Sequence, residues 1–150
     1  MHEEPVESSV RKKLMDAAIL LFTTRGYAAT SVREIVEMAG VTKPALYYHF
    51  QSKDGIYLAI LEDLVRIADE AIAASLVESG SARERIEGFL LGIFETFEKN
   101  KSAVRMINAV FWGPAQGVPP FDFDTFHQKL LAVLGRIVAE GVASGEFRAA

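Results

Sequence analysis

Cysteine is absent from this chain of 150 residues, which excludes disulfide bonds and thiol chemistry and fits a cytoplasmic protein. Long hydrophobic runs are also lacking, because charged residues interrupt every apolar stretch, so we expect no membrane-spanning segment. The first seven residues, MHEEPVE, are acidic and have no apolar core. We therefore expect a loose N-terminal arm rather than a secretory signal.

The residues that usually carry catalysis or bind metals are also scarce. Only three histidines occur, and His127 has one carboxylate, Asp124, at a spacing that could share a metal ion. A second ligand pair is missing, as are a phosphate-binding loop and a nucleophile elbow. The sequence therefore predicts no metal, no cofactor and no catalytic residue. An enzyme built on a helical bundle stays open as an alternative that no motif supports.

Apolar residues, by contrast, are plentiful. They make up half of the chain, and the mean hydropathy is +0.17, which is high for a protein of this size without a membrane segment. Such a composition predicts a well-filled core together with a ligand cavity, a partner surface or both.

Charge is divided unevenly along the chain. Residues 9–53 carry seven basic and three acidic side chains, whereas residues 54–150 carry nine basic and fourteen acidic ones. The net charges of these segments are +4 and −5, although the whole chain has a net charge of −4. This division favours a basic module that faces a polyanion and an acidic body that stays away from it, although a segment of +4 also arises by chance.

The apolar residues recur at helical spacing throughout, and no stretch alternates as a strand would. We predict seven helices, which cover about residues 9–25, 31–39, 42–50, 53–77, 82–99, 102–112 and 122–144. Ser31 and Glu34 form a capping box at the start of the second helix, and Gly40 ends it. Thr42 is a good N-cap for the third helix, since Pro44 is tolerated only in a first turn.

The second and third predicted helices are joined by a tight turn that contains glycine, which is typical of a helix-turn-helix unit. Leu46 and Phe50 share the face of the third helix that must enter the core, and Pro44 and Tyr48 share the opposite face. An outward face with tyrosines and small apolar groups suits DNA, because tyrosine hydroxyls can bond phosphate oxygens and small apolar groups can touch thymine methyls.

The stretch that contains these two helices resembles a known family. The run GYAATSVREIVEMAGVTKPALYYHF, residues 26–50, and the following KDGIYL, residues 53–58, look like the N-terminal domain of the TetR (tetracycline repressor) family. The resemblance covers about residues 10–62. It implies an all-α fold with a three-helix DNA-binding domain, residues 9–52. It also implies a helical domain for ligand binding and dimerisation, residues 53–150.

The resemblance also implies roles for individual residues. Base edges would be met by Thr42, Lys43, Pro44 and Ala45, and phosphates by Tyr47, Tyr48, His49 and Lys53. Ser31 and Arg33 lie at the start of the second helix, which abuts the DNA backbone in the family. Structural roles remain open beside these, because Thr42 can act only as a cap, Lys53 as a solvated helix start and His49 as a packing residue.

Aromatic residues concentrate between the fifth and seventh predicted helices, where the family binds its inducer. We expect a pocket for a small apolar or aromatic molecule, lined by Phe89, Ile93, Phe97, Phe111, Trp112, Phe126, His127 and Leu130. The loop at residues 113–121 is a possible entrance. Plain core packing is the alternative reading of the same aromatic residues.

The sequence thus predicts a transcriptional repressor that a small ligand releases from a near-palindromic operator in double-stranded DNA, with a homodimer as the binding form. A DNA-binding regulator without a ligand, controlled by a protein partner, is the alternative. Family members usually continue past Arg148 with one or two more helices that build the dimer interface. The chain is therefore expected either to be truncated at its C-terminus or to use other helices for the dimer.

Overall fold

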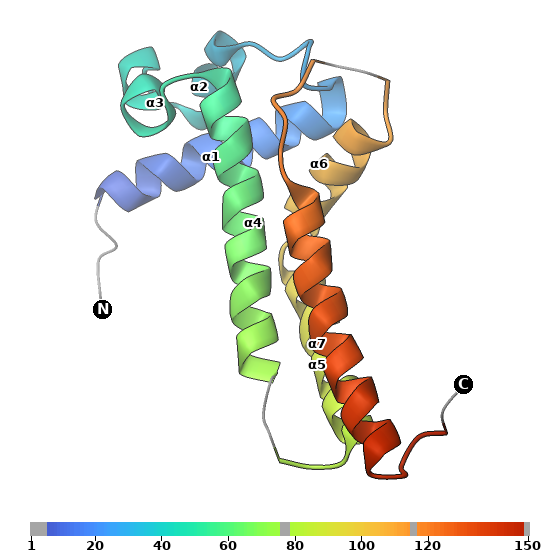
Figure 1. The fold of residues 1–150 in the computed structure, drawn as a ribbon. Helices are drawn as coiled ribbons and strands as arrows, with labels where there is room; N and C mark the ends of the chain where they lie inside the picture. The colour runs from blue at the N-terminus through green and yellow to red at the C-terminus, as the bar shows by residue number, and fades with distance from the viewer. Residues whose placement is uncertain (1–5, 76–78, 115–116, 149–150) are drawn as a thin grey trace. The chain divides into compact units, whose positions relative to one another are not determined.

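A computed structural model describes residues 6–75, 79–114 and 117–148, and within them it contains seven helices and no strand. The helices are α1 (Val6–Arg25), α2 (Val32–Ala39), α3 (Lys43–Phe50), α4 (Lys53–Ser75), α5 (Ala82–Lys99), α6 (Lys101–Phe111) and α7 (Phe123–Ala143) (Figure 1). The predicted all-α fold is therefore confirmed. No helix among the described residues has both the length and the apolar character needed to cross a membrane.

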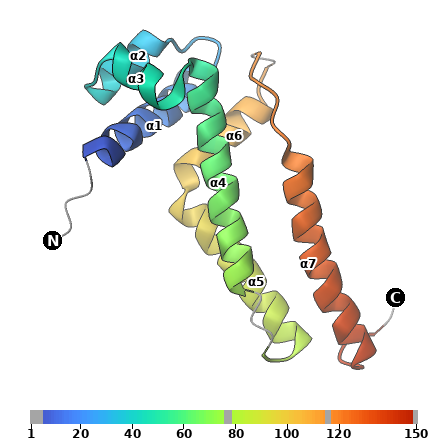
Figure 2. The ribbon, with the colours of Figure 1, turned by 60° about the vertical axis from the view of Figure 1, so that its left-hand side comes forward.

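The chain divides into two compact units, and the first comprises residues 1–63 and 101–121. Its helices α2 and α3 pack on α1, and α6 packs on α1 as well (Figure 2). Leu14, Phe22, Ile35, Leu46 and Ile56 are completely buried there, so α1, α2, α3 and the start of α4 all contribute to this core. α6 adds its buried Met106 and Val110.

The second unit comprises residues 64–100 and 122–150 and contains the C-terminal part of α4 together with α5 and α7. The start of α5 lies against the end of α7, because the Glu146 carboxylate accepts hydrogen bonds from the backbone N–H groups of Ala82 (2.7 Å) and Arg83 (2.9 Å). A Cβ atom at Gly141 would overlap the Phe147 ring, so only glycine permits this approach.

The predicted helix bounds differ from the structure in small ways. α1 begins at Val6 instead of Ser9, and residues 1–5 of the predicted arm lie outside the described residues, as does the predicted end of α4 at Val77. The predicted boundary between residues 52 and 53 does not coincide with the two compact units, because α6 packs on α1. The functional division into residues 9–52 and 53–150 stays a prediction.

Candidate nucleic-acid interface

The start of α2 is fixed by the capping box that the sequence predicted. Ser31 Oγ accepts a hydrogen bond from the Glu34 backbone N–H (3.2 Å), and the Ser31 backbone N–H donates to the Glu34 carboxylate (2.8 Å). Arg25, at the end of α1, also donates to that carboxylate. The hydrogen bonds from Ser31 and the charge of Arg25 lower the pKa of Glu34 below its ordinary value. The predicted capping box is confirmed, and the pair between Arg25 and Glu34 ties α2 to the end of α1.

The turn between α2 and α3 depends on Gly40, which has the left-handed backbone angle φ of 65°. The Gly40 N–H donates to the carbonyl of Glu37 (3.3 Å), and the Val41 N–H donates to the carbonyl of Val36 (3.0 Å). These two bonds close the end of α2, and the chain is then free to start α3 after two more residues. The predicted stop at Gly40 is therefore confirmed.

Helix α3 is short, and its core face fixes how it lies. Leu46 and Phe50 are buried, as the sequence predicted, and they hold the helix on the rest of the first unit. Thr42 occupies the N-cap with extended backbone angles, and its carbonyl accepts from the Ala45 N–H (3.1 Å). Its side chain makes no capping hydrogen bond. The Thr42 hydroxyl is thus left for another partner, whereas the hydroxyls of Ser31 and Ser52 are used as helix caps.

The outward face of α3 presents polar groups without internal partners. Thr42, Lys43 and Tyr47 are exposed, and within the described residues their side chains form no hydrogen bond or ion pair. Tyr48 is 73% exposed, and its ring lies nearly at right angles to that of half-buried His49, with 5.1 Å between the ring centres. Thr42, Lys43 and Tyr47 can therefore donate hydrogen bonds to a ligand without first breaking an internal contact.

Pro44 and Ala45 complete this surface with apolar groups. Pro44 is exposed, and Ala45 is half-buried beside it. Pro44 also removes one backbone donor from the first turn of α3, where no internal acceptor would be available to it. The residues predicted to contact bases thus lie at the N-terminus of α3, and their contacts with DNA stay a prediction.

The two predicted contacts on α2 have internal partners. Ser31 serves as the helix cap, and Arg33 forms an exposed ion pair with Glu37 (Nε to Oε1, 2.7 Å), which raises the pKa of Arg33. An exposed pair of this kind stabilises a helix by only about 0.3–0.5 kcal/mol, so a phosphate can replace Glu37 at little cost. Their roles in DNA binding stay predictions.

Lys53 lies in a more enclosed place than its sequence position indicates. Its ammonium group donates to the carbonyls of Tyr27 (3.0 Å) and Thr30 (3.0 Å), and it lies 4.2 Å from the centre of the Tyr27 ring. At most one N–H of this ammonium group remains for a phosphate. Lys53 therefore holds the loop between α1 and α2 against the start of α4, and its predicted phosphate contact stays a prediction.

Two parts of this network were missed by the sequence analysis. The Tyr27 hydroxyl donates to the Asp54 carboxylate, and burial, with further contributions from Asp54, raises the pKa of Tyr27. Arg11 lies over the Phe50 ring (5.5 Å to its centre) and pairs with Asp63 (3.0 Å). Tyr27 and Asp54 both lie in the stretches that resemble the family, so the resemblance could have pointed to this contact. No local pattern links Arg11 to Asp63.

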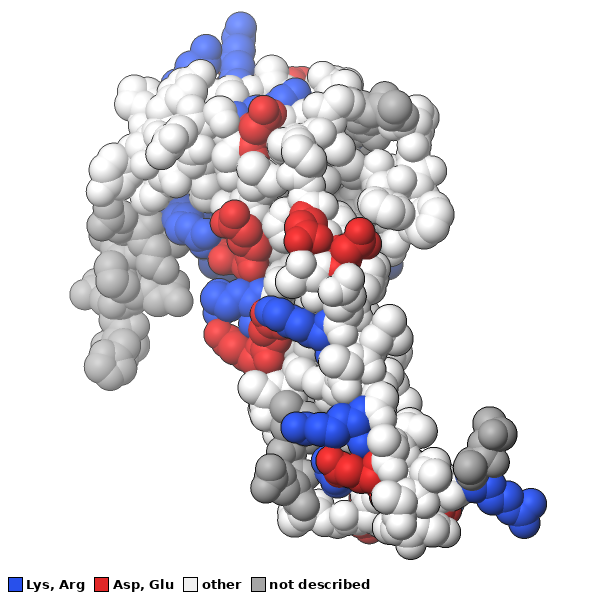
Figure 3. Space-filling model, viewed as in Figure 1, with Lys and Arg blue, Asp and Glu red and all other residues white. Residues whose placement is uncertain are grey.

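These contacts show that several basic side chains of the first fifty-odd residues already have internal partners. Arg11, Arg25, Arg33 and Lys53 all bind internal acceptors. On the visible face of Figure 3, most basic groups accordingly lie beside acidic ones. Lys13 and Lys43 are different, because no internal acceptor among the described residues binds either of them.

Comparisons with known proteins agree with this geometry. Residues 14–60 match the family model described as "Bacterial regulatory proteins, tetR family". The repressor KstR2 of Mycolicibacterium smegmatis is 30% identical over 145 residues, which cover 94% of this chain and 69% of KstR2. The chain belongs to the TetR family. It is a DNA-binding transcriptional regulator and not an enzyme, as the sequence predicted.

Other relatives differ in the direction of control. The activator FasR of Mycolicibacterium smegmatis is 35% identical over 97 residues, which cover 65% of this chain and 44% of FasR. Among solved structures, the TetR-family regulator PfmR from Thermus thermophilus has a TM-score of 0.75 and 27% identity, and the match covers 93% of this chain and 74% of PfmR. The TetR-family fold thus extends beyond the residues of the family model.

The residues predicted to line an inducer pocket fall into both compact units. Phe111 and Trp112 belong to the first unit, where both are exposed, and their rings pack edge to face with 5.1 Å between centres. Six belong to the second unit, namely Phe89, Ile93, Phe97, Phe126, His127 and Leu130. Of these six, Phe89 is buried, Phe97 and His127 are exposed, and the others are half-buried. The pocket stays a prediction.

Proposed function

We propose that this chain acts as a repressor that reads a near-palindromic operator through α3 and leaves it when a small ligand binds the second unit. The observation that carries the DNA part is the outward face of α3, on which Thr42, Lys43 and Tyr47 are exposed and, within the described residues, without internal partners. Their free donors match the acceptors of base edges and phosphates.

Within this surface we assign base reading to the N-terminal turn of α3 and anchoring to its aromatic residues. Thr42 and Lys43 lead the helix, and a recognition helix that enters the major groove contacts bases with its N-terminal residues. Tyr47, Tyr48 and His49 lie further along and would bind phosphates. Such contacts position a protein without reading sequence.

A selection experiment with random duplex DNA tests this assignment. Lys43→Ala should change the preferred sequence, with a loss of about 1–3 kcal/mol at the base that it reads. Tyr47→Phe should weaken all sites alike and leave the preferred sequence unchanged. If Lys43→Ala returns the same consensus as the unchanged chain, the base-reading role is wrong.

We propose a homodimer because one short recognition helix reads few base pairs. The two half-sites would then lie about 34–36 Å apart or at a multiple of that distance. Exposed apolar side chains on α5 and α7 support a partner surface in the second unit, among them Leu91, Phe94 and Leu131. Light scattering at several concentrations tests this, and a monomer at the concentrations that bind DNA contradicts it.

The ligand proposal concerns the second unit, where half-buried Phe126 and Leu130 provide apolar surface and exposed His127 provides a polar group, whereas Phe89 of the predicted lining is fully buried. Few polar groups among apolar walls suit a small apolar or aromatic molecule. A thermal-shift screen with such compounds tests the proposal, and Leu130→Asn should abolish the response to a true ligand. A ligand that releases DNA equally from Leu130→Asn binds elsewhere.

Activation of transcription is the second candidate, because FasR, which is 35% identical over its matched residues, is named an activator. DNA binding by α3 is common to both candidates. A reporter gene behind the selected operator separates them, since the regulator lowers its expression in one case and raises it in the other.

A further inference from the structure

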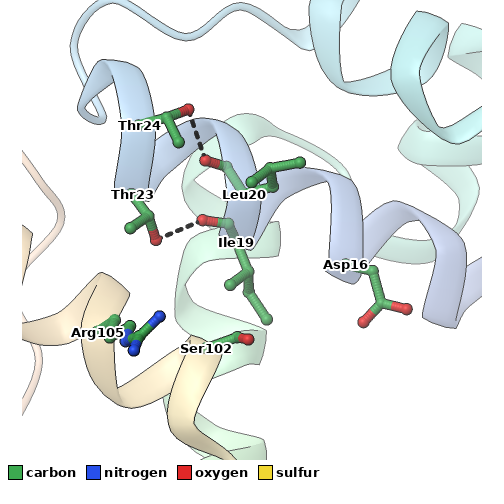
Figure 4. Close-up of a pocket in the computed structure, with 7 residues that line it drawn as sticks. All are labelled: Asp16, Ile19, Leu20, Thr23, Thr24, Ser102 and Arg105. Carbon is green, nitrogen blue, oxygen red and sulfur yellow. Dashed lines mark hydrogen bonds between the residues drawn. The ribbon is translucent and has the colours of Figure 1, made fainter.

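A groove of about 400 Å³ opens between α1 and α6, which both belong to the first unit (Figure 4). Helix α1 contributes Ile19, Leu20, Thr23 and Thr24, and α6 contributes Ser102 and Arg105. This volume lies within the range of small-molecule sites. The groove is separate from the eight residues predicted to bind an inducer, none of which lines it.

One wall of the groove is apolar and faces water. Leu20 is 52% exposed, although Leu14, Ala18 and Leu21 on the same helix are buried. Ile19 lies beside it and is half-buried. An apolar body placed here would remove both side chains from water, which is favourable in proportion to the area covered.

The hydrogen-bond donors of the groove come from α6. The hydroxyls of Thr23 and Thr24 already donate to the carbonyls of Ile19 (2.7 Å) and Leu20 (2.8 Å). Ser102 and Arg105 line the groove, and no hydrogen bond or ion pair occupies their side chains in the described part of the chain. They are three residues apart on one helix and therefore share a face.

The charges of the groove are not balanced. Asp16, at its rim, pairs with Lys12 (2.7 Å), whereas Arg105 has no such partner in the described part of the chain. Figure 4 shows Arg105 reaching from α6 toward α1, on the other side of Ile19 from Asp16. The groove thus combines an apolar wall with one uncompensated guanidinium, which can hold a carboxylate through two parallel hydrogen bonds.

We propose that this groove binds a small amphipathic carboxylate. The carboxylate accepts hydrogen bonds from Arg105 and Ser102, and the apolar body covers Ile19 and Leu20. An amine of the same shape binds less well than the carboxylate, because Arg105 repels its charge and Asp16 at the rim already shares its own charge with Lys12.

The site has a direct route to DNA binding. Helix α1 packs on α6 and also on α2 and α3, so a ligand in the groove contacts the helix that supports the recognition helix. If the ligand binds the free and DNA-bound forms unequally, operator affinity changes by the same factor as ligand affinity, typically about 5–150-fold. This consequence rests on the proposed DNA function, whereas the binding site does not.

Calorimetry of the full chain without DNA tests the site, with octanoate as the probe and octylamine as the probe of opposite charge. Octanoate should bind more tightly than octylamine. Arg105→Met should weaken octanoate binding by about tenfold or more, because a charge-assisted bidentate contact is lost. Arg66→Met, an exposed arginine of the second unit, is the matched control and should leave binding unchanged.

A second pair of variants tests the apolar wall. Leu20→Ser should weaken octanoate binding, whereas Met38→Ser, at a similarly exposed apolar residue on α2, should not. Both positions are exposed, so neither change threatens the fold. If octanoate fails to bind at millimolar concentration, or binds Arg105→Met as tightly as the unchanged chain, the proposal is overturned. Weakening by Leu130→Asn alone would place the ligand in the second unit and would also overturn it.

Operator affinity measured with and without octanoate then tests the coupling. A change in the unchanged chain that Arg105→Met abolishes supports a regulatory site. Octanoate binding that leaves operator affinity constant overturns the coupling but not the site. Failure of the chain to bind any operator would contradict the proposed function and leave the calorimetric result in place.

Discussion

The two units bury their apolar side chains to very different extents. In the first unit Leu14, Phe22 and Leu46 are completely buried, and the exposed positions of α3 are those that face DNA in the proposed function. In the second unit Leu91 is 62% exposed, and Phe94 and Leu131 are exposed to a similar extent. The first unit thus has a filled core around α1 and still leaves Leu20, Phe111 and Trp112 exposed, whereas the second unit leaves apolar surface along α5 and α7 for something else to cover.

Helix starts do not explain this difference, because both units use the same device. Ser31 and Glu34 form a capping box at α2, and Ser81 and Glu84 form one at α5. Helix capping is therefore alike at these two starts. The difference lies in α5 and α7, which carry exposed Leu91, Phe94 and Leu131 in addition to buried Phe89 and Ile137.

The largest expected effect comes from truncating one leucine in each unit. Leu46→Ala should lower the free energy of unfolding by about 2–5 kcal/mol, because it leaves a cavity in a closed core. Leu91→Ala should change it by less than about 0.5 kcal/mol. Urea denaturation of both variants measures this comparison.

A large loss of unfolding free energy in Leu91→Ala would contradict the expected difference between the two units. If that loss depends on protein concentration, a second copy covers α5, since the stability of a dimer varies with the concentration of its subunits. If the loss is independent of concentration, the second unit is closed like the first and the proposed partner surface is wrong.

Two lysines provide the next comparison. Lys53→Met removes two hydrogen bonds to backbone carbonyls and should cost about 1–3 kcal/mol. Lys129→Met removes an exposed pair with Asp69 (3.0 Å) in the second unit and should cost at most about 1 kcal/mol. Thermal unfolding of both variants tests the difference, and equal losses would contradict the anchoring role of Lys53.

The DNA side of the lysine comparison uses Lys43, which has no internal acceptor among the described residues. Lys43→Met should leave the unfolding free energy nearly unchanged and weaken operator binding by about 1–3 kcal/mol, because the base contact assigned to Lys43 is lost. Gel-shift titrations at several salt concentrations measure this loss and also the slope of log affinity against log salt. The slope should stay nearly constant, and a fall of about one unit would mean that Lys43 neutralises a phosphate instead.

Glycine to alanine changes should have opposite signs in the two units. Gly40→Ala forces a side chain into the left-handed conformation, which costs about 1–2 kcal/mol although nothing obstructs the new Cβ. Gly135→Ala, inside α7 and equally unobstructed, should stabilise the protein by about 0.5–1 kcal/mol because alanine favours helix. Thermal unfolding of the two variants tests this prediction. Melting temperatures that shift in the same direction in Gly40→Ala and Gly135→Ala would contradict it.

The smallest expected effect is the loss of stability at the two capping boxes when the pH falls. Hydrogen bonds from Ser31 and Ser81 lower the pKa values of Glu34 and Glu84. A lowered pKa in the folded state stabilises the fold fully above the ordinary glutamate pKa, about 4.3. This contribution is lost as the pH falls through the lowered value. NMR titration should show the pKa values of Glu34 and Glu84 below the ordinary value. Ser31→Ala should raise the pKa of Glu34 only, and Ser81→Ala should raise the pKa of Glu84 only.

Much of this fold was predictable because its signals are local. The capping box at Ser31, the stop at Gly40 and the opposed faces of α3 depend on residues within one or two helical turns. Their consequences were confirmed by the burial of Leu46 and Phe50. The assignment of DNA-contact residues relied on the family resemblance, and it stays a prediction for each residue.

Other features required distant parts of the chain to meet. Most helix bounds and the core face of α3 could be predicted from the sequence, because backbone capping and apolar spacing act over a few residues. Only the folded chain shows that Lys53 binds the carbonyls of Tyr27 and Thr30, and that α6 packs on α1. Such contacts join residues 23 or more positions apart, and their partners are selected by packing, which no local pattern encodes.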